Sequence, residues 1–498
     1  MLCSRLCLVC SVLAAGLLIH APVAEAAEKR PPNIVFILAD DLGINDLGCY
    51  SGERQITPQL DKLAGQGMQL TSAYCAQPIC SPSRAAILTG KTPARLHLTT
   101  FLPGRADAPS QKLLHPRIQQ QLPLEEKTLA EYLGEAGYAT ACIGKWHLGG
   151  KGFGPAEQGF QTVHTGQANT QPSAEEGGKG EYDLTRAAIR FIEAHKEQPF
   201  FLYLPHNNPH IPLAARPELV EKHKGAFNPL YAAVLETLDD SVGLLLAKLD
   251  ELKLSDNTIV IFTSDNGGLH VLEYPESPAT HNSPYRAGKG FLYEGGLRIP
   301  LIVRWPGNTP AGLIRDTPVN NTDWAPTLLD LCGVKVAAKT NTKFDGESIA
   351  PLLTGKQVDL PDRTFFWHFP HYTNQGSRPG GAVREGRWKL IEHYDTGEAE
   401  LYDLAQDVSE TDNVAAAQTE RVTQMREKLA AWRKDIGAQA NTPNPSFDES
   451  LFRKLYVDVD VSKLLPAETA AEMRPGLRDW RATMNEVLPS RPQAGKSK

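Results

Sequence analysis

The amino-acid sequence predicts an α/β protein with a large, doubly wound, mostly parallel sheet flanked by helices. A small C-terminal antiparallel sheet with one packed helix is expected to follow it. Three observations support this prediction: short runs that are apolar on both faces, helical patterns between those runs, and closely spaced strand patterns after residue 362. Alternation of buried strands with helices is typical of a doubly wound parallel sheet.

Four apolar runs define the expected large sheet, and polar residues follow each of them. Helical patterns lie between the runs, for example over residues 128–137 and 231–252. Ligands of such sheets bind beyond the carboxyl ends of the strands, so the residues after each run are candidates for a functional site. The runs are NIVFIL from Asn33, YATACI from Tyr138, FFLYL from Phe200 and TIVIF from Thr258.

After residue 362 the pattern changes to short strands that follow one another closely. FFWHF from Phe365, AVREGRWKLIEH from Ala382 and ELYDL from Glu400 predict a small antiparallel sheet. Apolar residues at helical spacing between Val422 and Ile436 predict one helix packed on it. The expected parts are a main α/β domain (28–362), a small α+β subdomain (363–440) and a C-terminal extension (441–498) that is disordered at its end.

The first 27 residues have the layout of a secretory signal peptide. Arg5 precedes an apolar run that extends to Ile19, and the sequence Ala-Glu-Ala-Ala ends near a cleavage point at Ala26 or Ala27. The run is shorter than the roughly 20 residues that a membrane-spanning helix needs. We therefore expect an exported protein, periplasmic or secreted and lysosomal in a eukaryote, without stable membrane insertion.

Charge and cysteine content limit the remaining functional classes. The chain of 498 residues has a net charge of −7 and no run of basic residues, which argues against nucleic acid as a partner. Three of the eight cysteines lie in the signal segment, and the rest are too sparse for a disulfide framework. One disulfide bond stays open as an alternative, but free buried thiols are the expectation.

The segment CSPSRAAILTG, from Cys80 to Gly90, combines a cysteine, a proline and an arginine at the start of an expected helix. Proline is favoured at the first helical position, so we expect Pro82 there. Cys80 and Ser81 would then lie at the helix N-terminus, where free amide groups and the helix dipole favour an anion. The alternative is a buried cysteine at the start of an ordinary helix, with Arg84 on its surface.

Carboxylates follow two of the apolar runs. Asp40 and Asp41 come after the first run, and Asp265 and Asn266 come after the fourth. Adjacent carboxylates repel each other unless a cation or a basic group neutralises them. Oxygen ligands without sulfur or imidazole suit Ca²⁺ or Mg²⁺ better than Zn²⁺. Taken singly, each pair is also compatible with a turn or a helix cap.

Together these motifs resemble the type I sulfatases of the alkaline phosphatase superfamily, in the branch of arylsulfatase A and N-acetylgalactosamine-6-sulfatase. Residues 80–90 match the sulfatase signature C-x-P-x-R-x4-T-G. The other matching segments occur in the family's order and extend over most of the chain. They are NIVFILADDLG from Asn33, GKWHLG from Gly144, PHIP from Pro209, TSDNGG from Thr263, GKGFLYEGGLRIP from Gly288 and ELYDLAQD from Glu400.

The resemblance implies that a maturation enzyme oxidises Cys80 to formylglycine. It also implies one calcium ion held by Asp40, Asp41, Asp265 and Asn266, with the modified Cys80 and the substrate sulfate completing the site. A sulfuryl group in transfer needs fixed positive charge around its oxygens, as a phosphoryl group does. The basic ring that the resemblance implies consists of Arg84, Lys145, His147, His210 and Lys289.

In the implied mechanism, one hydroxyl of the hydrated formylglycine attacks sulfur. Lys145 and Lys289 bind sulfate oxygens, and Arg84 holds the aldehyde hydrate and the metal ligands. His210 protonates or polarises the leaving oxygen, and His147 takes the proton of the second hydroxyl so that sulfate leaves. Asn282 and Arg286 are candidates for contact with the leaving group.

The expected function is therefore sulfate monoester hydrolysis, with a sulfated carbohydrate or an aryl sulfate as substrate. Two alternatives stay open. The same fold and nucleophile can hydrolyse phosphodiesters or phosphonate monoesters, and the chain can also be a non-catalytic binder of sulfated glycan with an unmodified Cys80. A binder has no need of both His147 and His210, which argues against the latter.

Overall fold

The computed structural model describes residues 30–51, 56–165, 173–273, 278–336 and 343–488. The predicted signal peptide and the predicted disordered end, from residue 491 on, lie outside the described residues. The described residues from Pro31 on belong to one compact unit, and all structural statements below concern them. No helix in the described part of the chain is both long enough and apolar enough to cross a membrane.

The large sheet is mixed but mostly parallel, as predicted. Its strand order is β10-β2-β8-β7-β1-β6-β4-β5, and β9 pairs with β2; β8 alone runs antiparallel to its neighbours β2 and β7. The four predicted apolar runs form its centre as β7, β1, β6 and β4. The strands are β1 (Asn33–Ala39), β2 (Met68–Tyr74), β4 (Ala139–Ile143), β5 (Thr162–His164), β6 (Phe200–Pro205), β7 (Thr258–Ser264), β8 (Arg298–Arg304), β9 (Leu313–Arg315) and β10 (Val319–Asn320).

Strand register brings the ends of the central strands to one edge. Ala39 at the end of β1 pairs with Ser264 at the end of β7, and Leu38 pairs with Pro205 at the end of β6. Every residue of β1, β6 and β7 is buried, which explains why these runs are apolar on both faces. The polar residues that follow the strands therefore meet at one edge of the sheet.

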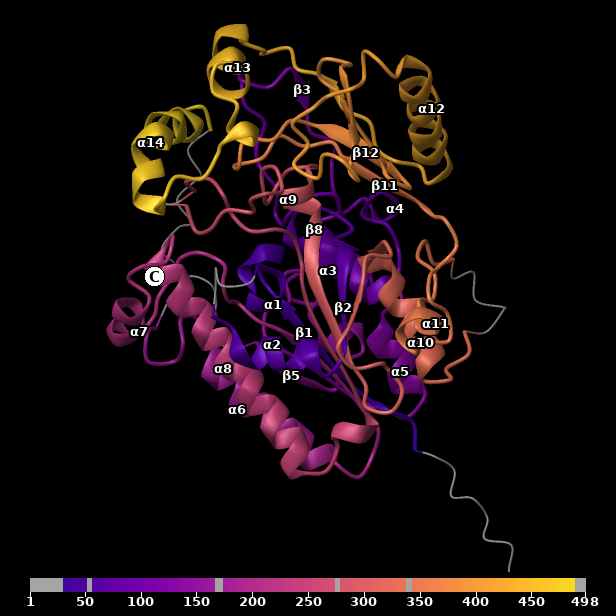
Figure 1. Ribbon diagram of the computed structural model, residues 1–498. Coiled ribbons are helices and arrows are strands. Elements are labelled where there is room, and N and C mark those ends of the chain that lie inside the picture. Colours follow the sequence, from indigo (N-terminus) through magenta and orange to yellow (C-terminus); the bar gives the residue numbers. More distant parts are fainter. Residues whose placement is uncertain (1–29, 52–55, 166–172, 274–277, 337–342, 489–498) are drawn as a thin grey trace, which may run out of the picture. The chain divides into compact units, whose positions relative to one another are not determined.

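Helices cover both faces of this sheet, so the doubly wound architecture is confirmed (Figure 1). The helices α6 and α8 pack against each other on one side, and α3, α5 and α10 pack together on the other. The longer helices are α2 (Pro58–Gly65), α3 (Cys80–Thr89), α5 (Leu129–Glu135), α6 (Glu181–His195), α8 (Pro229–Glu251) and α10 (Trp324–Leu331). The shorter ones are α1 (Gly48–Ser51), α4 (Pro93–Leu96), α7 (Pro217–Lys222), α9 (Glu294–Leu297) and α11 (Ala350–Leu353).

The predicted small sheet and its helix are also confirmed. Four antiparallel strands follow one another as β11 (Thr364–Phe369), β12 (Gly380–Glu385), β13 (Trp388–His393) and β14 (Ala399–Asp403), and α12 (Thr419–Asp435) packs on them. Met425 and Leu429 of α12 join Val383, Leu390 and Leu401 in a separate small core. The aromatic and methionine stripe of this helix is therefore core, as expected.

The C-terminal extension contains two helices that the sequence patterns did not predict, α13 (Glu449–Tyr456) and α14 (Ala470–Glu486). Phe452, Leu455, Leu477 and Trp480 of these helices are buried in the large core. The helix α13 is short and lies in a segment rich in polar residues, and Pro475 lies inside α14, which explains why the sequence patterns did not predict them. A short pairing of β15 (Thr442–Pro443) with β3 (Leu113–Leu114) ties the extension to the main part.

Five cysteines lie among the described residues as free thiols, of which Cys75, Cys80 and Cys142 are buried and Cys49 and Cys332 are half-buried.

Candidate active site

The helix α3 presents Cys80 as its first residue. Ile79 is its N-cap, and Gly90, with φ of 66°, ends it in the left-handed conformation that glycine favours. We expected Pro82 at the first helical position, but the helix begins two residues earlier and Pro82 is its third residue. This is tolerated because the first amide groups of a helix have no partner within it. Cys80 and Ser81 lie at the helix N-terminus, as predicted.

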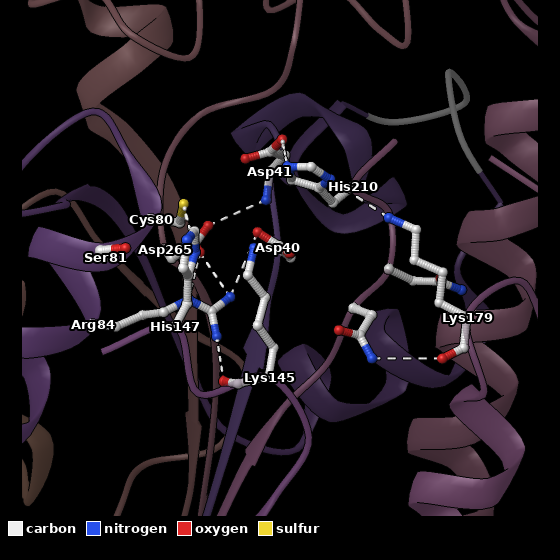
Figure 2. Close-up of polar contacts among 12 residues, drawn as sticks. Asp40, Asp41, Cys80, Ser81, Arg84, Lys145, His147, Lys179, His210 and Asp265 are labelled. Carbon is white, nitrogen blue, oxygen red and sulfur yellow. Dashed lines mark hydrogen bonds and ion pairs between the residues drawn. The ribbon is translucent and has the colours of Figure 1, made fainter. Parts of the chain in front are cut away.

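The two pairs of metal-ligand candidates meet beyond the ends of β1 and β7. Figure 2 shows Asp40, Asp41 and Asp265 of this group. The Asp41 amide donates to Asp265 Oδ1 at 3.1 Å, and Asn266 Nδ2 donates to Asp41 Oδ1 at 2.8 Å. Asp41 has φ of 65°, a conformation that aspartate tolerates better than most residues. All four residues, Asp40 included, are at most 2% exposed.

The donor atoms of this cluster fit a hard divalent cation. Asp40 Oδ1 and Asn266 Oδ1 are buried without a hydrogen-bond partner. Asp40, Asp41 and His210 each offer one possible metal-ligand atom. These three atoms lie within 4.8 Å of one another. Buried oxygens without partners cost free energy unless a cation or a donor reaches them. Carboxylate and amide oxygens are the ligands that Ca²⁺ and Mg²⁺ prefer.

Arg84 lies between the carboxylates and connects α3 to them. It is fully buried, and its Nε donates to Asp265 Oδ2 at 2.8 Å while Nη2 lies 2.7 Å from the same oxygen. Its Nη1 donates to the Lys145 carbonyl at 2.8 Å, and Nη2 lies 3.5 Å from Asp40 Oδ1. The alternative of a surface arginine on an ordinary helix is therefore wrong.

Two buried lysines contact the adjacent carboxylates. Lys145 Nζ donates to Asp40 Oδ2 at 2.6 Å, and Lys289 Nζ donates to Asp41 Oδ2 at 2.7 Å. Burial by itself raises the pKa of Asp40, but Lys145 and other nearby cations outweigh it and hold that pKa well below its usual range. Burial raises the pKa of Asp265 to about 8 even though Arg84 opposes the change. A bound cation would stabilise the ionised form of this carboxyl group.

His147 is oriented as a proton acceptor toward residue 80. Its Nε2 lies 2.9 Å from the Leu102 carbonyl, which only accepts hydrogen bonds, so Nε2 carries the ring proton. Nδ1, the other ring nitrogen, lies 3.3 Å from Cys80 Sγ. Burial and the charge of Lys145 lower the pKa of His147 to about 4, which keeps the ring neutral at pH 7. The ring therefore offers a lone pair to a group at position 80.

His210 lies on the other side of the carboxylates, with Nε2 at 3.5 Å from Asp41 Oδ2. Its Nδ1 contacts the Ile211 carbonyl at 2.5 Å. Burial and Lys289 hold the pKa of His210 well below its usual range. His206, which the sequence motifs favour less, is fully buried and bonds Glu181 instead of the site.

Lys179 is a site residue that the sequence analysis missed. Its Nζ donates to the Ile211 carbonyl at 2.7 Å and lies 3.4 Å from His210 Nδ1 (Figure 2). The side chain is only 1% exposed, and burial lowers the pKa of Lys179 to about 7. A signal was present in the sequence, because a glycine precedes Lys179 as it precedes Lys145 and Lys289. Gly178 has φ of 85° and no room for a side chain beside Asn208.

A comparison with protein-family models agrees with this geometry. The model described as Sulfatase matches residues 32–334, more than half of the chain, and the model described as N-sulphoglucosamine sulphohydrolase, C-terminal, matches residues 287–435. The chain belongs to the sulfatase family. It is accordingly a sulfuric ester hydrolase.

Named relatives support the same assignment. N-acetylgalactosamine-6-sulfatase of Canis lupus familiaris is 35% identical over 383 residues, which cover 70% of either chain. Arylsulfatase A of Homo sapiens is 34% identical over 417 residues, covering 75% of this chain and 77% of the human one. The crystal structure of Ps i-CgsB in complex with k-i-k-neocarrahexaose superposes with a TM-score of 0.70 at 26% identity, covering 91% of this chain and 100% of that chain.

The two candidates for leaving-group contact lie in different surroundings within this sulfatase. Asn282 is buried, and its amide nitrogen donates to the carbonyls of Gly268 and Ala287, both at 2.9 Å. Arg286 donates to Tyr402 and to Ser462 of the C-terminal extension, both at 2.9 Å. Asn282 thus supports the loop that leads to Lys289, whereas Arg286 holds the extension against that loop.

Proposed function

We propose that this sulfatase hydrolyses sulfate monoesters, in particular those of sulfated carbohydrates, with a hydrated formylglycine at position 80 and one calcium ion. The observation that carries the proposal is the position of Cys80. It lies at the N-terminus of α3, 3.3 Å from His147 Nδ1, in a site where buried cations accompany a cluster of oxygen ligands. Asp40, Asp41, Asp265 and Asn266 would hold the calcium ion, whose charge would help to bind and polarise the sulfate group.

Formylglycine supplies two geminal hydroxyl groups when hydrated, one to attack sulfur and one to expel sulfate afterwards. His147 suits the second step, because its Nδ1 is an unprotonated acceptor directed at residue 80. Arg84 fixes Asp265 through two guanidinium nitrogens and keeps the helix that carries residue 80 next to the oxygen cluster. Unmodified cysteine cannot provide both hydroxyl groups, so we propose that a maturation enzyme converts it.

Lys145 and Lys289 are proposed to bind the sulfate oxygens. Each of these lysines is at most 9% exposed, and its ammonium group contacts one of the two adjacent aspartates, so its position is fixed before substrate arrives. Fixed positive charge of this kind stabilises the charge that develops in sulfuryl transfer. His210 directs Nε2 toward Asp41, and we assign this nitrogen to the leaving oxygen. The negative charge of the substrate favours a protonated ring there.

A sulfated sugar is the substrate class that we propose, with aryl sulfates as accepted model substrates. In support, one relative is named for action on a sulfated sugar and another for action on aryl sulfates. A structural neighbour holds a neocarrahexaose oligosaccharide. We further propose that the protein is exported, in agreement with the signal-like first 27 residues.

The decisive experiment compares turnover of nitrophenyl sulfate and nitrophenyl phosphate, which share a leaving group. We expect the sulfate ester to be strongly preferred by protein made in a host that has the maturation enzyme. The peptide that contains residue 80 should have lost sulfur and should react with hydrazides. The Cys80→Ala variant should be inactive on both esters. Preference for the phosphate ester, or full activity of Cys80→Ala, would overturn the proposal.

A further inference from the structure

A second polar cavity lies where the large and small sheets meet, and none of the residues assigned to the active site lines it. Its volume is about 500 Å³, within the roughly 300–1,000 Å³ of small-molecule sites. The large sheet contributes Ser72 of β2 and Arg298 of β8, and the small sheet contributes Arg384 of β12. Loops at residues 316–318 and 359–363 complete the walls.

Three arginines with little exposure line this cavity, and two of them have strong partners. Arg298 donates to Ser72 at 2.7 Å and to Tyr285 at 3.1 Å, and its Nε lies 3.3 Å from Glu294. Arg363 donates through Nη2 to both oxygens of Asp323, at 2.8 and 2.9 Å. These contacts fix the two side chains whether or not a ligand is present.

Arg384, the third arginine, differs from these two. It is 8% exposed, and its Nε and Nη1 are buried without a hydrogen-bond partner. Among the described residues its guanidinium group forms no ion pair with a carboxylate within 4.0 Å, and it lies 4.8 Å from the centre of the Tyr74 ring. Two buried N–H groups without an acceptor are costly, and an oxyanion is a natural partner for them.

The charges around Arg384 lead to the same conclusion. Lys389 forms ion pairs with Glu294 and Glu410, both at 2.9 Å, and Arg298 pairs with Glu294. The pKa of Glu294 is held at about 2 by Lys389, Arg298 and Arg384, which outweigh the effect of its burial. Three cations therefore share two carboxylates in this buried cluster. The buried wall of the cavity, counted without its exposed rim, thus has one positive charge in excess.

The rim of the cavity carries the opposite charge. Asp316, Asp359 and Asp362 line it and are exposed. These carboxylates repel any anion, and the repulsion grows with the charge of the ligand and is weakened by solvent at the exposed rim. A single oxyanion is therefore disfavoured much less than a densely charged polymer.

We propose that this cavity is an accessory site for a single tetrahedral oxyanion, a sulfate ion or the sulfate ester of a small sugar, with Arg384 as its main ligand. Guanidinium groups pair with such oxyanions through two parallel hydrogen bonds. The oxyanion can come from two sources that share this chemistry. It can be the sulfate ion that the enzyme releases as its product, or a sulfate group of a carbohydrate.

Selenate, which replaces sulfate and scatters anomalously, tests the site directly. Crystals soaked in selenate should show an anomalous peak beside Arg384, in addition to any peak in the active site. Arg384→Gln should remove the cavity peak and keep the other. The control is Arg387→Gln, because Arg387 lines the same cavity but is exposed and already paired with Asp403. The proposal would be overturned if the wild-type crystals showed no anomalous peak in the cavity, or if the peak persisted in Arg384→Gln.

Titration calorimetry separates the two sources in a Cys80→Ala background, where no ester is hydrolysed. A monosulfated monosaccharide, free sulfate and the unsulfated sugar are the three probes. We expect Arg384→Gln to weaken binding at the accessory site about tenfold or more, and Arg384→Lys, which keeps the charge, to weaken it less. Tighter binding of the sulfated sugar than of sulfate identifies a carbohydrate site, and equal binding identifies a product site. Identical isotherms for the Arg384 variants and their parent would refute the role of Arg384.

Discussion

Replacement of Arg84 by methionine tests the electrostatic design of the active site most directly. Methionine keeps much of the volume of the side chain but removes its charge and all of its donors. Arg84 is fully buried, and its guanidinium contacts Asp265 at 2.7 and 2.8 Å and the Lys145 carbonyl at 2.8 Å. Without it, Asp265 keeps only the Asp41 amide as a close donor to its side chain among the described residues.

The expected loss of stability follows from this loss of partners. Removing one member of a buried ion pair typically costs about 3–5 kcal/mol, because the remaining charge stays buried and uncompensated. Above pH 8, where Asp265 is ionised, Arg84→Met should therefore lower the free energy of unfolding of the metal-free protein by about 3–5 kcal/mol, and at lower pH, where this carboxyl group takes up a proton, by less. A calcium ion at the same carboxylates would replace part of the missing positive charge. We expect added calcium to reduce the difference in free energy of unfolding between Arg84→Met and the wild type.

Urea unfolding in the presence of a chelator, followed by tryptophan fluorescence, measures this difference. The matched control is Arg186→Met, because Arg186 pairs with Glu176 at 2.7 Å but is 52% exposed. Exposed pairs contribute about 0–1 kcal/mol, so this variant should unfold almost like the wild type. If Arg84→Met is no less stable than Arg186→Met, the buried charge of Arg84 does not stabilise the site and the argument fails.

Three further predictions concern residues around the substrate. Asp265→Ala should lose calcium binding and turnover together, and calcium should restore chelated wild-type enzyme better than zinc; a zinc-dependent enzyme would contradict this. His210→Ala should slow sugar sulfates much more than nitrophenyl sulfate, whereas His147→Ala should slow both alike, by about 10²–10⁴, and accumulate protein with covalently bound sulfate. If covalently bound sulfate accumulated in His210→Ala but not in His147→Ala, the roles of the two histidines would be the reverse of those assigned here. Lys179→Met should show the same dependence on the leaving group as His210→Ala but more weakly, since Lys179 and His210 share the Ile211 carbonyl; equal loss on both substrates would contradict this.

Much of this site could be predicted from the sequence because its chemistry follows directly after buried strands. Parallel strands end at a common edge, so the pairs that begin at Asp40 and Asp265 had to approach each other once both runs were recognised as central strands. The motif around Cys80 predicted a helix N-terminus, and the resemblance to sulfatases implied that it lies at the same site. Only the approach of the two carboxylate pairs follows from local patterns and the geometry of a parallel sheet.

Other features depend on contacts that no local pattern reveals. Lys179 reaches His210 through a glycine-rich turn, and its burial is a property of the folded loop. The helix α13 is amphipathic but only eight residues long, and Pro475 lies inside α14, so neither segment has a long uninterrupted helical pattern in the sequence. Arg384 meets its charged neighbours across the seam between the two sheets, where residues far apart in sequence come together.

The balance of charges in the active site leads to a last prediction. Above the pKa of about 8 that burial gives Asp265, the carboxylates of Asp40, Asp41 and Asp265 are matched by the cations of Arg84, Lys145 and Lys289, and the nearby histidines are neutral. Such a balanced cluster has little attraction for an anion until a divalent cation adds its charge. Sulfate should therefore bind to the active site at least about tenfold more weakly in a chelator than in calcium, and calcium should bind more tightly in the presence of sulfate by the same factor. Both factors can be measured by calorimetric titration of sulfate with and without calcium, and of calcium with and without sulfate. The Arg384→Gln variant is used so that sulfate does not bind at the proposed accessory site. If the affinity for sulfate did not change with calcium, the lysines and Arg84 would bind sulfate without a metal, and the prediction would be wrong.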